Sequence, residues 1–174
     1  MSRRFLRLVA AMALLVLAPA TACAGSTVAP GSSSVTVARV VDGDTLVLRG
    51  GARLRLLQID APEAGGECHS AASARELARL ARPGTRVSVE ADRRLDRVDR
   101  YGRLLRYVHV ATTNVNVELV RRGAATPWFY RGERGRYADR LLSAVREARE
   151  AQRGMWGACR VTWSPTRAVE TRPR

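Results

Sequence analysis

The sequence predicts a mainly β fold with a few helices, and three observations lead to that prediction. Short runs of β-branched and other apolar residues recur along the chain, separated by turns rich in Gly, Asp and Pro. One alanine- and leucine-rich stretch with helical spacing interrupts these runs, and two more follow them. The length of 174 residues accommodates one domain with its own core, in addition to a leader and a tail.

Five segments have the composition of strands. The first two flank an Asp-Gly-Asp turn, and Gly50-Gly51 then forms a hairpin into the third. A polar loop separates the fourth segment from the fifth. The predicted strands are 35–41, 45–48, 53–59, 86–91 and 103–110. Together with an intervening helix, they fit a five-stranded β-barrel.

Three segments are predicted to be helices. Residues 70–82 carry Leu77 and Leu80 among alanines and end at a Pro-Gly pair. Residues 117–122 form a short second helix that ends at a glycine. Residues 137–153 have an apolar stripe at helical spacing and also end at a glycine.

Residues 1–24 have the pattern of an export signal, in which arginines precede an apolar run, 8–18, that is too short to span a membrane comfortably. Residues 25–34 are rich in Gly, Ser, Pro and Thr and indicate a flexible linker. The folded domain is expected over 35–160. Residues 161–174 combine prolines and charges, so a disordered basic tail is expected there.

The chain has three cysteines, at 23, 68 and 159. If Cys68 and Cys159 form a disulfide, Cys23 is left over, and lipidation at a bacterial lipobox would account for it. Ordinary cleavage at Ala22-Cys23-Ala24 is the alternative, so the exported protein is either secreted or membrane-anchored. A metal site on Cys68, His69 and Cys159 is disfavoured because no fourth ligand has usable spacing.

The formal charge is +14, and all 30 basic residues are arginine. Removing the leader, which carries three arginines and no acid, leaves +11. A polyanion is therefore an expected partner, with salt-sensitive binding. The absence of lysine itself is attributed to codon usage.

Acidic residues group around one arginine in this basic chain. Asp42 and Asp44 flank a turn glycine, Asp60 follows the third predicted strand, and Arg55 lies within that strand. Oxygen ligands of this kind suit a hard cation such as calcium, and an arginine fork suits phosphate. Strict alternation places Arg55 and Asp60 on opposite faces of the strand, so they converge only if a bend or bulge interrupts it.

The segments 41–45, 55–63 and 99–103 resemble the thermonuclease family, whose best-known member is staphylococcal nuclease. The resemblance extends from about residue 35 to 157 and implies an OB-fold barrel. It also implies site residues. Those matching metal ligands are Asp44, Asp60, the carbonyl of Ala61 and, through water, Asp42; those matching catalytic residues are Arg55, Glu63 and Arg103.

The same resemblance implies substrate contacts. Arg100 and Tyr101 match residues that contact a terminal phosphate. Phe129 is the closest match to an aromatic that stacks on a base, and Trp128 or Tyr130 are alternatives for that role. No role is assigned to His69 or His109, which match no catalytic position.

The resemblance therefore implies an exported, calcium-dependent phosphodiesterase that cuts DNA and RNA, favours unpaired regions and leaves 3′-phosphate ends. Two other functions remain open: a non-catalytic OB-fold module that binds nucleic acid, and a surface lipoprotein for which nucleic acid is incidental. A monomer is the expected state.

Overall fold

The computed structural model describes residues 32–174. The predicted leader and the lipidation of Cys23 lie outside the described residues. The predicted linker, 25–34, overlaps them at its end, where Ser32–Ser34 already belong to the first strand and pair with the strand that contains Ser88. The backbone, rather than the small polar side chains, makes this pairing. No helix within residues 32–174 is long and apolar enough to cross a membrane.

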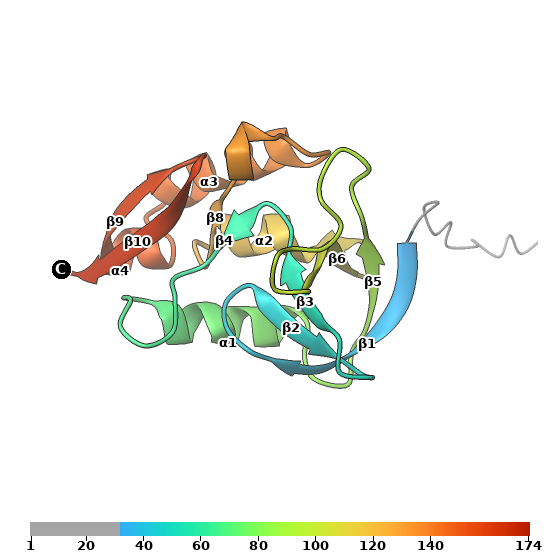
Figure 1. The fold of residues 1–174 in the computed structure, drawn as a ribbon. Helices are drawn as coiled ribbons and strands as arrows, with labels where there is room; N and C mark the ends of the chain where they lie inside the picture. The colour runs from blue at the N-terminus through green and yellow to red at the C-terminus, as the bar shows by residue number, and fades with distance from the viewer. Residues whose placement is uncertain (1–31) are drawn as a thin grey trace, which may run out of the picture.

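Five strands form a closed barrel (Figure 1). Its hydrogen-bonded order is β3-β2-β1-β5-β6, and a parallel pairing of β3 with β6 closes it. The strands are β1 (Ser32–Val40), β2 (Thr45–Leu48), β3 (Arg53–Leu56), β5 (Arg86–Glu90) and β6 (Leu104–Val110). A short β7 (Thr113–Asn114) pairs with the end of β6. The predicted five-stranded OB-type barrel is confirmed.

Three main helices accompany the barrel, as the periodicity predicts. They are α1 (Ser70–Leu80), α2 (Val115–Arg121) and α3 (Ala138–Glu150), and α2 contacts both of the others. The side chain of Asn114 accepts a hydrogen bond from the Val117 amide and so caps α2, which begins two residues before its predicted start. A 3₁₀ turn, η1 (Tyr130–Gly132), and a short α4 (Met155–Ala158) complete the helical elements.

The core lies inside the barrel and beneath the helices. Leucines and valines from β1, β2, β3 and β6 meet apolar residues of α1, α2 and α3 there. The largest fully buried aliphatic side chains of that cluster are Leu46, Leu54, Leu56, Ile59, Leu77, Leu119 and Leu141. Burial of this apolar surface is the main source of stability.

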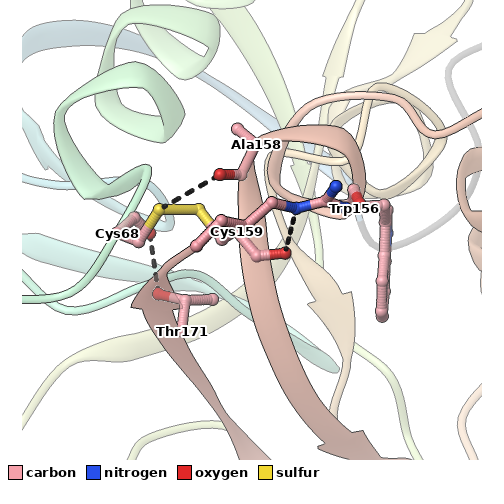
Figure 2. The surroundings of a disulfide bond; sticks show 6 residues. Cys68, Trp156, Ala158, Cys159 and Thr171 are labelled. Carbon is pink, nitrogen blue, oxygen red and sulfur yellow. Dashed lines mark hydrogen bonds between the residues drawn. A yellow bond between two sulfur atoms is a disulfide. The ribbon is translucent and has the colours of Figure 1, made fainter.

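The prediction of a disordered tail is wrong. Residues 159–173 form a two-stranded hairpin of β9 (Cys159–Ser164) and β10 (Arg167–Pro173), drawn in red in Figure 1. A small buried cluster of Met155, Cys159 and Val169 lies beneath it. The Cys68–Cys159 disulfide, with 6.0 Å between the two Cα atoms, joins the hairpin to the loop before α1 (Figure 2).

Two further short strands connect the hairpin to the barrel. β4 (Ile59–Asp60) follows directly after β3, and it pairs with β8 (Thr126–Pro127). The indole of Trp163 on β9 donates a 2.8 Å hydrogen bond to the carbonyl of Pro127. The hairpin therefore lies against β8 on the side of the molecule where β4 presents Asp60.

Candidate active site

Asp44, Arg55 and Asp60 converge beside the mouth of the barrel. Arg55 Nη1 lies 3.0 Å from Asp44 Oδ2, and Arg55 Nη2 lies 2.7 Å from Asp60 Oδ1. Arg55 also donates a 2.8 Å hydrogen bond to the carbonyl of Ile59, and its exposed fraction is only 6%. One guanidinium thus connects the two carboxylates that the sequence singles out.

The bend that this convergence requires lies at Gln58. The backbone there has φ of 60°, so the chain turns between β3 and β4 and brings Asp60 to the side of Arg55. The side-chain amide of Gln58 donates to the carbonyl of Glu133 at 2.6 Å, and its oxygen accepts from the Gly135 amide at 2.8 Å. The Tyr107 hydroxyl donates to the same oxygen at 3.2 Å. These contacts hold a glutamine in a backbone conformation that usually favours glycine.

Gly43 allows the Asp-Gly-Asp turn to approach the Asp60 loop closely. A Cβ atom on Gly43 would lie 2.5 Å from the Cβ of Ala61 and 2.8 Å from the Cβ of Ser73 on α1. Side-chain oxygens of the turn also support the pocket: Asp42 Oδ1 accepts from the Asp44 amide at 3.0 Å, and Asp44 Oδ2 accepts from the Ala61 amide at 3.0 Å. Glycine is needed at residue 43 because any side chain there would clash with Ala61 and Ser73.

The pocket holds more negative charge than its arginine balances. Burial raises the pKa of Asp44 to about 7, because Arg55 only partly opposes the desolvation, and Asp42 and Asp60 add to it. Burial also raises the pKa of Asp60, again against the opposing effect of Arg55. A cation bound here would relieve this repulsion.

The donor set fits a hard divalent ion. Asp44 and Asp60 supply carboxylate oxygens, and the backbone of Ala61 and the side chain of Asp42 lie beside them. Within residues 32–174, no three acidic, histidine or cysteine side chains are grouped closely enough to hold an ion by themselves. An ion here would therefore need backbone and solvent oxygens as well, as calcium readily accepts.

Glu63 lies on the exposed loop after Asp60. Its amide donates a 2.7 Å hydrogen bond to Glu67 Oε2, which shapes the loop. Partial burial raises the pKa of Glu63, the charges of Asp60 and Asp42 raise it further, and Arg55 opposes them. Glu63 is therefore within the electrostatic reach of the buried pocket while remaining accessible to water.

A cleft of about 470 Å³ extends from Arg55 across the barrel surface. Arg103 lines it, with its Nε 2.7 Å from Asp99 Oδ2. Arg100 and Tyr101 form one wall, and the exposed fraction of Tyr101 is 66%. The structure thus brings both predicted catalytic arginines and both predicted phosphate-contacting residues to the same cleft.

The aromatic segment faces the cleft with Trp128 and Tyr130, whereas Phe129 points into the core. Phe129 is only 3% exposed, which contradicts the prediction that it stacks on a base. The exposed fraction of Tyr130 is 55%, and the ring of Trp128 lies 5.6 Å from the Arg55 guanidinium. Backbone hydrogen bonds to distant residues hold this segment, from the Trp128 amide to the Gln58 carbonyl and from the Phe129 amide to the Pro165 carbonyl. Neighbouring aromatics in a sequence do not reveal such contacts.

Two residues at the site escape sequence reasoning. The bend lies at Gln58, yet glutamine as a residue type gives no signal of a positive φ. Val169 donates its amide to Asp60 Oδ2 at 2.8 Å, and it lies in the segment predicted to be disordered. The alternating apolar residues Val161, Trp163 and Val169 were the only available hint of a hairpin there.

Comparison with known proteins places these features in a family. The family model described as "Staphylococcal nuclease homologue" matches residues 53–158. A micrococcal nuclease of Shigella flexneri is 37% identical over 133 residues, which cover 69% of this chain and 71% of that protein. A thermonuclease of Staphylococcus intermedius is 32% identical over 135 residues, covering 71% and 76% respectively. An uncharacterized endonuclease of Escherichia coli O157:H7 is 36% identical over 125 residues, covering 69% and 74%. The chain belongs to the family of staphylococcal nuclease homologues.

Proposed function

We propose that this protein is an exported, calcium-dependent nuclease that hydrolyses phosphodiester bonds of DNA and RNA. The observation that carries the proposal is the position of Arg55, which lies between two buried carboxylates and opens onto a cleft lined by Arg103. The nuclease names of the relatives support the same activity.

The two arginines have complementary roles. The guanidiniums of Arg55 and Arg103 hold the non-bridging phosphate oxygens and stabilise the charge that develops on them. Asp99 orients Arg103 through the Nε contact, leaving its terminal nitrogens available to the phosphate. Burial of Arg55 strengthens its electrostatic effect, because little water screens it.

Glu63 orients the attacking water and accepts its proton. Water oxygen bonds to phosphorus as the bond from phosphorus to the 5′ oxygen breaks. The 5′ oxygen takes up a proton from solvent, and Glu63 returns the proton it accepted to solvent. The products are a 3′-phosphate and a 5′-hydroxyl. Asp44, Asp60 and the Ala61 carbonyl, with Asp42 through water, would hold a calcium ion, which would supply Lewis-acid polarisation of the phosphate.

Unpaired nucleic acid fits the cleft best. Tyr130 presents an exposed ring on which a splayed base can stack, and a duplex keeps its bases stacked internally. The net charge of +14, or +11 once the leader is removed, attracts the phosphate backbone without regard to sequence. We therefore expect little sequence preference and strong salt dependence.

The test is degradation of plasmid and single-stranded DNA in calcium or in a chelator. Glu63→Gln, Arg55→Lys and Arg103→Lys should each lower kcat by orders of magnitude while circular dichroism shows a folded protein. Arg79→Lys is the matched control, because Arg79 is exposed on α1 and pairs with Glu76. Wild-type protein that binds DNA but leaves it intact in calcium would favour the non-catalytic module instead.

Export is a separate part of the proposal. The arginine-led apolar segment at the start of the sequence supports it, and Cys23 supports anchoring by a lipid. Mass spectrometry of the membrane fraction distinguishes the forms. A lipid on Cys23 identifies a lipoprotein, and an unmodified chain in the medium identifies a secreted enzyme.

A further inference from the structure

We propose that the β9–β10 hairpin is a positioning element of the active site and that the backbone amide of Val169 orients the carboxylate of Asp60. This inference rests on the proposed function of Asp60 as a metal ligand. It assigns a role to a part of the chain that begins where the match to the family model ends, at residue 158.

Asp60 is held by two donors from distant parts of the chain. Arg55 Nη2 donates to Oδ1 at 2.7 Å, and the Val169 amide donates to Oδ2 at 2.8 Å. The side chain is only 6% exposed, so solvent cannot readily replace either donor. With one donor on each oxygen, the plane of the carboxylate is fixed before an ion arrives.

The loop that follows Asp60 and carries Glu63, residues 61–68, is called the acidic loop here. The hairpin is also bound to the far end of this loop, at Cys68. Thr171 Oγ1 donates to the carbonyl of Cys68 at 2.7 Å, and the Cys68 amide donates to the carbonyl of Thr171 at 3.4 Å. Figure 2 shows Thr171 beside Cys68, where the disulfide to Cys159 adds a covalent link. The loop that carries Glu63 is therefore bound to β10 at both ends.

The other strand of the hairpin, β9, and the turn after it contact residues 127–129. The Phe129 amide donates to the carbonyl of Pro165 at 2.6 Å, and Trp163 donates to Pro127. Figure 1 shows the hairpin alongside β4 and β8. The hairpin thus contacts both the acidic loop and the aromatic segment 128–130, and it fixes their positions relative to each other.

Outer-shell hydrogen bonds to metal ligands typically change metal affinity or activity by about 10- to 100-fold when removed. The donor here is a backbone amide, so only a change that removes the N–H tests it. Val169 lies in the irregular part of the β9–β10 register, between the pairs formed by Arg167 and Glu170. Proline at such a position removes the amide while leaving the paired residues intact.

The experiment compares Val169→Pro with Val169→Ala in the full-length protein. Alanine trims the side chain but keeps the N–H, so it is the matched control. Calorimetric titration with calcium alone and initial rates on single-stranded DNA provide two independent readouts. We expect calcium affinity and kcat of the proline variant to fall by about tenfold or more relative to the alanine variant.

A second variant covers the case in which the proline chain does not fold. Cys159 allows native chemical ligation, so residues 159–174 can be made synthetically. This segment can carry an ester in place of the peptide bond between Ala168 and Val169, which removes the Val169 N–H. The ligated all-amide protein is its control. Equal calcium affinity in the ester and amide proteins, or in the proline and alanine variants, overturns the inference. Wild-type protein that neither binds calcium nor cuts DNA instead overturns the proposed function.

Discussion

Replacing Gly43 with alanine tests whether the acidic pocket depends on the close approach of the Asp-Gly-Asp turn to Ala61 and Ser73. The added Cβ would lie 2.5 Å from the Cβ of Ala61 and 2.8 Å from the Cβ of Ser73. Carbon atoms prefer separations of about 3.5 to 4.0 Å, so the Asp-Gly-Asp turn must move by about 1 Å. A misplacement of that size lowers a positioned reaction by about 100-fold. The overpacking itself should destabilise the fold by about 1 to 3 kcal/mol.

Gly66 supplies the control for this substitution. A Cβ on Gly66 meets no atom within 4 Å, and its φ is not positive, so Gly66→Ala should keep wild-type activity and melting temperature. The assay measures initial rates on single-stranded DNA in calcium, together with thermal unfolding of each variant. Wild-type rates in Gly43→Ala would refute the argument that the turn must touch the Ala61 loop.

Further predictions concern pH, the disulfide and the aromatic segment. Without metal, the raised pKa of Asp44 means that the folded state binds an extra proton between pH of about 4 and 7. Stability should therefore rise as pH falls through that window, by up to about 1.4 kcal/mol per pH unit, while calcium affinity falls. Thermal unfolding in chelator and calcium titration check this, and an unchanged pH profile in Asp44→Asn would contradict it. Replacing Cys68 and Cys159 with serine should lower the free energy of unfolding by about 4 kcal/mol, because the bridge closes a long loop. Denaturant titrations measure this change. An unchanged free energy of unfolding would show that the bridge does not constrain the unfolded chain. Phe129→Ala should destabilise the fold by about 3 to 5 kcal/mol, whereas Tyr130→Ala should raise KM and leave the melting temperature unchanged; the reverse pattern would refute the assignment of the core and cleft faces.

The barrel could be predicted from the sequence because local patterns carry it. Runs of valine and leucine, separated by Gly and Asp turns, mark all five strands. Asp44, Arg55 and Asp60 could be singled out because acidic residues group around one arginine there, in short segments that resemble the thermonuclease family. Their convergence around one guanidinium follows from the fold and not from their spacing.

The bend at Gln58 could not be predicted from its neighbours. Glutamine has no preference for positive φ, and the contacts that hold it come from Tyr107 and from the segment 133–135. The third strand was therefore predicted to run to residue 59, whereas β3 ends at Leu56. Long-range contacts outweigh local preference at this point.

The hairpin was missed for a similar reason. Its prolines and charges suit a solvated tail, and few of its residues are apolar. What orders it is a cluster with Met155, a disulfide to Cys68 and a hydrogen bond to Pro127, all outside the segment itself. The burial of Phe129 escapes prediction in the same way, because its backbone is held by the carbonyl of Pro165, in the segment predicted to be disordered.

The bond between Asp60 and Val169 spans 109 residues, and this separation has a consequence for biogenesis. A ribosome adds about 5 to 20 residues per second, so roughly 5 to 20 s pass between synthesis of the two partners. During that interval a growing chain has Asp60 but not the Val169 amide that donates to its carboxylate. Long-range contacts also form late in folding, which lengthens the interval. A nuclease built in this way would reach full activity only after the segment that contains Val169 has been synthesised.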